Sequence, residues 1–152
     1  MEIKKQILAV IQARMNSTRL PGKVLKKIGD STCIEILLKR LSKSELIDQV
    51  IVVTSTNKYD DILYDKLNKI GVDCFRGEET NVYKRFLDAL KNSEASVILR
   101  ITADCPLIDP VLVDKIIRDF LSKDVDYVSN VDPPSFPDGM DVEVIDRNCL
   151  EN

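Results

Sequence analysis

Histidine is absent from this 152-residue chain. Its absence excludes Ser-His-Asp triads, histidine metal sites and acid–base catalysis by an imidazole. Carboxylates, lysines, arginines and a metal ion are left to carry any chemistry. The loop after the first predicted strand also lacks the GxGxxG pattern, which disfavours a Rossmann dinucleotide site.

The cysteines are few and widely spaced. Cys33, Cys74, Cys105 and Cys149 lie tens of residues apart without a CxxC pair, which is neither a zinc pattern nor a dense disulfide framework. We expect buried free thiols in a reducing compartment. Residues 1–6 show no signal peptide and no apolar run is long enough to span a bilayer. The sequence therefore predicts a cytoplasmic protein without a membrane partner.

The chain also lacks a large excess of charge of either sign. Its net charge is only −3, although 31% of the residues are charged. Binding to nucleic acid needs a broad basic face, so this class of partner is not expected. The length predicts a single domain over residues 1–152, large enough to bury about 68–70% of its unfolded surface.

Apolar runs and amphipathic segments alternate along the chain. Buried strands are predicted at residues 7–11, 50–53, 72–75 and 97–101, and two later strands at 125–128 and 142–145. Four strand–helix alternations predict a three-layer α/β/α fold with a mostly parallel sheet. The inward faces of the helices are predicted to consist of Ile34, Leu37, Leu38 and Leu41; Ile62, Leu63, Leu67 and Ile70; Val82, Phe86, Leu87 and Leu90; and Val113, Ile116, Ile117, Phe120 and Leu121.

Start signals support three of these helices. Thr32 and Glu35 have the spacing of a capping box. Asp60 and Asp61 are expected in the first turn of a helix that stops at Gly71. Asp109 followed by Pro110 has the form of an N-cap with proline at the first helical position.

A basic loop follows the first predicted strand. It carries Arg14, Arg19 and Lys23, with hydroxyls at Ser17 and Thr18. Ligands of open α/β sheets bind outside the carboxyl ends of the strands, and cations placed there suit the phosphates of a nucleotide. The alternative is a solvated basic surface loop.

A second polar segment follows the strand predicted at 97–101. Asp104 should lie at the same sheet edge, where a carboxylate beside phosphates can hold Mg²⁺, or else cap nearby backbone amides. Asp109 is interpreted only as a helix cap. Arg100 is expected either to reach a phosphate or to pair with a neighbouring aspartate.

The segment QARMNSTRLPGKVL resembles the N-terminal signature of cytidylyltransferases that activate acidic sugars, such as the CMP-KDO and CMP-sialate synthetases. The likeness is greatest to the spore-coat polysaccharide biosynthesis cytidylyltransferase-like family. Further blocks resemble that family in order, namely FRG leading into VYKRF, then RITADCPLID, DYVSN and FPDGMDVEV.

This resemblance implies a nucleotide-diphospho-sugar transferase (GT-A-like) fold that lacks its C-terminal part here. It also implies transfer of CMP from CTP to a sugar, with an acidic sugar expected and pyrophosphate released. CTP, the sugar, Mg²⁺ and a second copy of the chain are the expected partners. A GT-A glycosyltransferase using a nucleotide-sugar donor and a non-catalytic nucleotide-binding module remain the alternatives.

Carried over by position, the resemblance assigns roles to most of the site residues. Catalysis is assigned to Arg14, Lys23 and Asp104, with Asp104 as the metal ligand. Nucleotide binding is assigned by the resemblance to Ala13, Arg14, Arg19, Lys23, Thr102 and Ala103, and the residue pattern adds Ser17 and Arg100. The sugar side is assigned to Asp138, Gly139 and Asp141.

Overall fold

The computed structural model describes residues 5–152. Residues 1–4 lie outside this range. They belong to the segment 1–6, in which the sequence indicated no signal peptide. The strands are β1 (Ile7–Gln12), β2 (Lys27–Ile28), β3 (Ser31–Thr32), β4 (Gln49–Ser55), β5 (Cys74–Gly77), β6 (Val97–Thr102), β7 (Tyr127–Ser129) and β8 (Glu143–Asp146). The helices are α1 (Cys33–Leu41), α2 (Asp61–Lys69), α3 (Val82–Leu90), α4 (Pro110–Leu121) and α5 (Arg147–Glu151), with short 3₁₀ turns η1 (Lys23–Leu25) and η2 (Lys58–Asp60).

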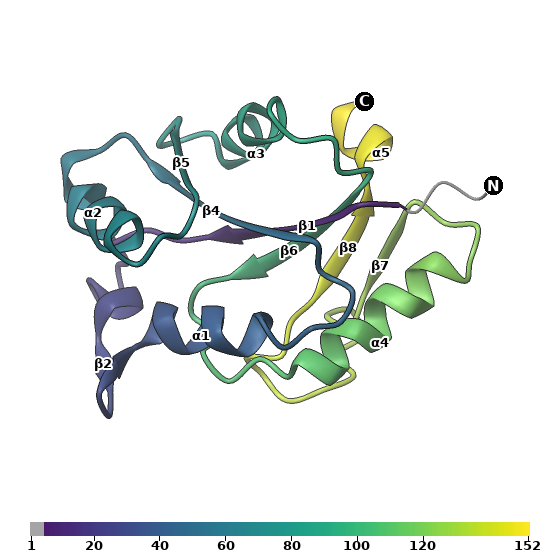
Figure 1. The fold of residues 1–152 in the computed structure, drawn as a ribbon, viewed down its shortest axis with the longest axis horizontal. Coiled ribbons are helices and arrows are strands. Elements are labelled where there is room, and N and C mark those ends of the chain that lie inside the picture. Colours follow the sequence, from purple (N-terminus) through teal and green to yellow (C-terminus); the bar gives the residue numbers. More distant parts are fainter. Residues whose placement is uncertain (1–4) are drawn as a thin grey trace.

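Six strands form one mixed sheet in the order β5-β4-β1-β6-β8-β7 (Figure 1). Strand β1 pairs in parallel with β4 and β6, and β4 pairs in parallel with β5. Strand β8 runs antiparallel between β6 and β7. The prediction of a mostly parallel sheet is therefore confirmed. The central position of β1 explains its uninterrupted apolar sequence, because both of its faces are buried.

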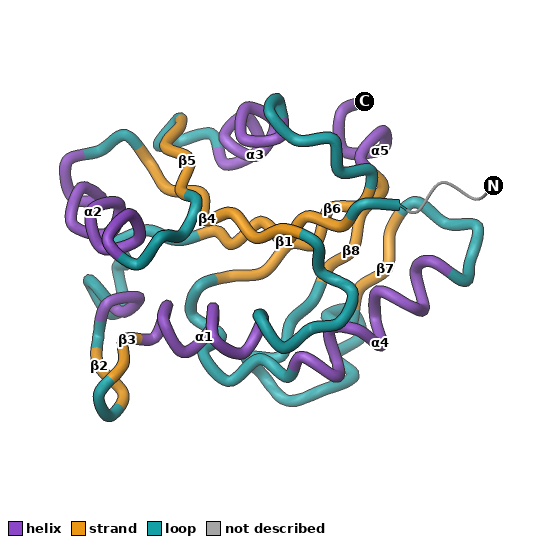
Figure 2. Tube along the Cα trace, in the orientation of Figure 1, coloured by secondary structure: helices purple, strands orange, loops and turns teal. Residues whose placement is uncertain are grey.

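Helices cover both faces of the sheet, as predicted. Buried side chains of α1, α2 and α4 pack in one core on one face. Helix α3 packs in a second core on the opposite face, where Leu150 of α5 also lies. The two helical layers are seen on either side of the strands in Figure 2. Within the part of the chain that the structure describes, no helix is both long and apolar enough to cross a membrane.

The predicted capping box at the start of α1 is present. The Thr32 amide donates to Glu35 Oε2 at 2.8 Å, and Glu35 N donates to Thr32 Oγ1 at 3.4 Å. Lys66 Nζ of α2 lies 2.6 Å from Glu35 Oε1, so one carboxylate joins two helices. Hydrogen bonds from Lys66 and Thr32 lower the pKa of Glu35 from 4.5 to about 2. Asp109 likewise caps α4 by accepting from Val111 N at 2.9 Å.

Replacing Glu35 by glutamine is expected to lower the free energy of unfolding at pH 7 by about 1 kcal/mol, because the amide keeps the cap but loses its charge. The folded-state pKa is depressed, so the carboxylate stabilises the fold above pH 4.5 and this contribution is lost as pH falls through about 2. Urea unfolding of both proteins between pH 2 and 7 measures the difference. A difference that does not shrink at low pH would contradict this role.

Three predicted inward positions are wrong. Ile62, Ile70 and Leu121 are 59%, 40% and 43% exposed. In α2 the buried stripe consists of Leu63 and Leu67, four residues apart, and Ile62 points away because neighbouring residues on a helix are about 100° apart. The four cysteines are free as predicted, but only Cys105 is buried and Cys149 is exposed.

Candidate functional site

The basic loop folds back on itself at the carboxyl end of β1. The Met15 carbonyl accepts hydrogen bonds from both Ser17 N, at 3.0 Å, and Gly22 N, at 2.8 Å. Gly22 has a φ of +69°, and a Cβ there would lie 3.3 Å from Met15 Cε. The turn therefore requires glycine, and it returns the chain to η1, where Lys23 begins the 3₁₀ turn.

The loop and the end of β6 enclose a shared cavity of about 230 Å³. Strands β1 and β6 are neighbours whose last residues, Gln12 and Thr102, are in register, and Ala103 N donates to Gln12 O at 3.0 Å. The two polar segments therefore leave the sheet side by side. The cavity is lined by Gln12, Ala13, Arg14, Ser17, Thr18, Arg19, Lys23, Val24, Thr102, Ala103 and Asp104.

Nearly all residues assigned to the nucleotide thus gather in one place, although they come from segments about 80 residues apart. Lys23 Nζ lies 2.5 Å from Asp104 Oδ2. Partial burial acts to raise the pKa of the Asp104 carboxyl, but hydrogen bonds from Lys23 and Thr102 and the lysine charge outweigh it and lower the pKa. The carboxylate therefore stays ionised and available to a cation.

Arg14 and Arg19 differ from Lys23. Within residues 5–152 neither guanidinium forms a hydrogen bond or an ion pair, and both residues are exposed at the cavity. Two fixed positive charges without an internal partner are free to contact an anion.

Arg100 is the exception among the residues assigned to the nucleotide. It does not line the cavity, and its guanidinium forms an ion pair with Glu143 and donates to Gln12 Oε1 at 3.3 Å. The antiparallel register of β6 with β8 places Arg100 opposite Glu143. Of the two predicted alternatives the structure shows pairing, with a glutamate rather than an aspartate.

A second cavity, of about 620 Å³, adjoins the first and shares Arg19, Thr102 and Asp104 with it. Its other lining residues are Cys105, Pro106, Leu107, Pro137, Asp138, Gly139, Met140 and Asp141. The three residues assigned to the sugar side therefore line the same cavity as Asp104.

Buried Asn130, which sequence reasoning missed, fixes the loop that carries the sugar-side residues. Its amide nitrogen donates to Met140 O at 2.8 Å, and its Oδ1 accepts from Val142 N at 2.8 Å. In the sequence Asn130 ends the DYVSN block, two residues after the strand predicted at 125–128, and nothing in that block shows that its amide would reach residues 140 and 142.

In the described part of the chain, no three acidic or cysteine side chains lie close enough together to hold a metal ion. Asp104 is the carboxylate that faces both cavities. Mg²⁺ in nucleotide sites is typically bound by one or two carboxylates, with phosphate oxygens and water as the other ligands. The one ionised aspartate in this cavity is compatible with a magnesium ion that takes its other ligands from phosphate oxygens and water.

Comparison with known proteins agrees with this geometry. Residues 8–138 match the model of the family described as "Cytidylyltransferase". The chain is 45% identical over 124 residues to an uncharacterized protein of Methanocaldococcus jannaschii, covering 82% of this chain and 51% of that protein. It is 38% identical over 148 residues to the spore coat polysaccharide biosynthesis protein SpsF of Bacillus subtilis, covering 95% and 60%. The chain thus spans about half to three fifths of the length of these curated relatives.

A solved structure shares the same arrangement. A cytidylyltransferase from Leptospira borgpetersenii superposes with a TM-score of 0.91 at 37% identity, over 97% of this chain and 63% of that one. The family match extends from β1 into the loop that lines the second cavity, so it includes both polar segments of the site. The chain belongs to the cytidylyltransferase family.

Proposed function

We propose that this chain forms the nucleotide-binding part of an enzyme that transfers CMP from CTP to a sugar and releases pyrophosphate, in surface polysaccharide biosynthesis. One observation carries the proposal: the basic loop and Asp104 line one cavity, which shares Arg19, Thr102 and Asp104 with a second, larger one. The first cavity suits a triphosphate and the second suits an acceptor. The cytoplasmic location and the homodimer stay predictions.

The residues of the first cavity fit the charge demands of the reaction. Attack on the α-phosphorus needs neutralisation of the triphosphate, stabilisation of the leaving pyrophosphate and an aligned nucleophile. Arg14 and Arg19 would bind phosphate oxygens directly, because neither has another partner in the described chain. Lys23, next to Gly22, would move its charge from Asp104 to the phosphates.

Asp104 would hold Mg²⁺ once Lys23 bonds to phosphate. The ion would neutralise phosphate charge and help to activate the attacking hydroxyl. The backbone of Ala13, at the end of β1, would face the base, and Thr102 and Ala103 would form the opposite wall.

The acceptor would lie in the second cavity, among Asp138, Gly139 and Asp141. With Arg19 engaged by phosphate, the charged groups left in this lining are carboxylates. We therefore propose that Asp138 and Asp141 accept hydrogen bonds from sugar hydroxyls. A magnesium ion held at Asp104 would supply positive charge for the carboxylate of an acidic sugar.

Calorimetric titration with CTP, UTP, ATP and GTP, each with and without Mg²⁺, tests the nucleotide part of the proposal. CTP-selective binding that Mg²⁺ strengthens is the expected result, and equal binding of all four nucleotides would refute base selection. Release of pyrophosphate in the presence of a sugar then distinguishes nucleotidyl transfer from glycosyl transfer. Selective binding without pyrophosphate would indicate a non-catalytic module.

A further inference from the structure

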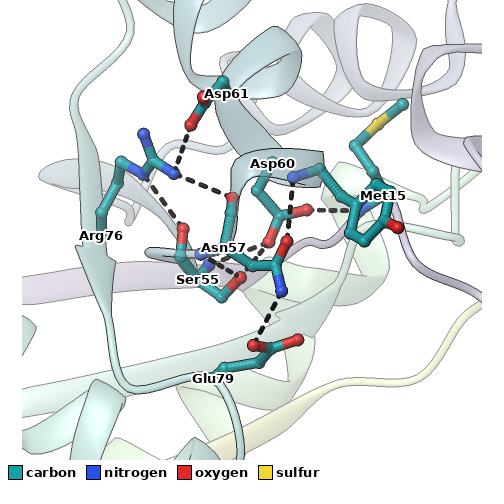
Figure 3. A network of polar contacts seen from close by, with 8 residues as sticks. Met15, Ser55, Asn57, Asp60, Asp61, Arg76 and Glu79 are labelled. Atoms are coloured by element: carbon teal, nitrogen blue, oxygen red, sulfur yellow. Dashed lines mark hydrogen bonds and ion pairs between the residues drawn. The ribbon is translucent and has the colours of Figure 1, made fainter.

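Asp60 links the basic loop to the rest of the molecule without lining the nucleotide cavity. It lies at the end of η2 and is only 2% exposed. Figure 3 shows its carboxylate between the loop and the end of β4. Oδ1 accepts from Met15 N at 2.7 Å, and Oδ2 accepts from Ser55 N at 3.1 Å and from Ser55 Oγ at 2.5 Å.

Through its bond to Met15 N, the Asp60 carboxylate is connected to the backbone turn of the basic loop. The Met15 amide that Asp60 holds belongs to the peptide bond with Arg14. The carbonyl of Met15 accepts from Ser17 N and Gly22 N, and Gly22 immediately precedes Lys23. One side chain therefore sets the direction in which the chain leaves Arg14 and returns to Lys23.

The Asp60 carboxylate is buried within the protein. Burial of a carboxylate is unfavourable unless hydrogen bonds compensate for lost water. Within residues 5–152 the hydrogen-bond donors to Asp60 are three neutral groups, and the positive charge of the buried Arg85 interacts with it without a direct ion pair. A small cavity separates it from Arg14 and from the buried Arg85, whose Nε has no hydrogen-bond partner in the described structure.

We propose that Asp60 is a positioning residue for triphosphate binding, which fixes the Met15 amide so that Arg14 and Lys23 face the phosphates. The inference rests on the proposed function, because it assigns the loop to a nucleotide. It adds a residue that lines neither the nucleotide cavity nor the second, larger cavity, and that acts through the Met15 peptide group.

Two substitutions of Asp60 separate positioning from folding. Asp60→Ala removes all three acceptor contacts and is expected to weaken CTP binding roughly 10- to 100-fold, since displacement of about 1 Å in a site has effects of that order. Asp60→Asn keeps one oxygen that can accept from Met15 N but sets an NH₂ group near the Ser55 donors. An intermediate loss of affinity is expected for it.

The neighbouring Asp61 supplies a matched control. Its Oδ1 pairs with Arg76 Nη2 at 2.7 Å, it is half exposed, and it does not contact the loop. Asp61→Asn removes the same charge one residue away and should leave CTP affinity within about twofold of the wild type, because exposed pairs contribute little.

Amide hydrogen exchange without nucleotide distinguishes a loosened loop from a general loss of stability. In the Asp60 variants, exchange is expected to accelerate at Met15, Ser17 and Gly22, while amides of β1 and β6 stay protected. Faster exchange throughout the sheet together with unchanged CTP affinity would overturn the proposal and leave Asp60 a purely structural residue. Unchanged exchange at Ser17 and Gly22 would overturn it as well.

Exchange also separates the two proposals. If the wild type binds no CTP, the proposed function fails whatever Asp60 does. Loop-specific exchange would then still establish that Asp60 orders the loop, and the part of the inference that concerns triphosphate would fall with the proposed function.

Discussion

Replacing Arg19 by alanine is expected to weaken CTP binding by about 2–4 kcal/mol, roughly 30- to 1000-fold, the range for loss of a charge-assisted contact in a desolvated site. Arg19 lines both cavities and has no internal partner in the described chain, so its substitution breaks no existing bond. Calorimetry with Mg²⁺-CTP measures the loss, and the melting temperature should stay within a degree or two.

Arg118 provides the control for this change. It is an exposed arginine of α4 that lies 3.3 Å from Glu45 and lines neither cavity. Arg118→Ala removes the same charge, so a loss of affinity in both variants would indicate long-range attraction rather than contact. Unchanged affinity in Arg19→Ala would return the loop to the interpretation of a solvated surface.

Replacing Asp104 by asparagine should abolish the dependence of CTP binding on Mg²⁺. Without Mg²⁺ the variant is expected to bind CTP at least as tightly as the wild type, because a carboxylate no longer faces the triphosphate and Lys23 is released from its pair. With Mg²⁺ it should bind roughly 10- to 100-fold more weakly than the wild type, as expected for loss of a metal ligand. Titrations at several Mg²⁺ concentrations give both values.

Stability tests the alternative interpretation of Asp104. Its ion pair with Lys23 is partly exposed, so its loss should change the free energy of unfolding by less than about 1 kcal/mol. Asp109→Asn is the control, since asparagine is an equally good N-cap and Asp109 lines neither cavity. A large drop in melting temperature for Asp104→Asn with Mg²⁺ dependence retained would make Asp104 a structural cap.

Local signals in the sequence were sufficient for much of the fold. The apolar run of β1, the capping box at Thr32 and the Asp109–Pro110 start each depend on neighbouring residues, and all three are present. The meeting of the basic loop with Asp104 was also predictable, since both follow buried strands and parallel strands end at a common edge.

The remaining features depend on long-range pairing. Arg100 is paired because β8 enters the sheet antiparallel beside β6, and nothing near Arg100 in the sequence indicates this. Asp60 and Met15 are 45 residues apart, so a local pattern could suggest only an acidic first turn. Ile62 is exposed because the side of α2 that carries Leu63 faces the core. Ile62 and Leu63 are adjacent and both apolar, so the sequence does not indicate which of them faces inward.

The β7–β8 hairpin lies at one edge of the sheet. Its connecting segment, residues 130–142, contributes one wall of the second cavity, and among the described strands the hairpin is hydrogen-bonded to the parallel part of the sheet through the pairing of β8 with β6. The basic loop is anchored on the other side of β6, through β1 and β4. Insertions or exchanges of sequence within this hairpin can therefore reshape the larger cavity while the strands beneath the basic loop keep their register. The fold thereby allows one half of the site to diversify while the other stays constant.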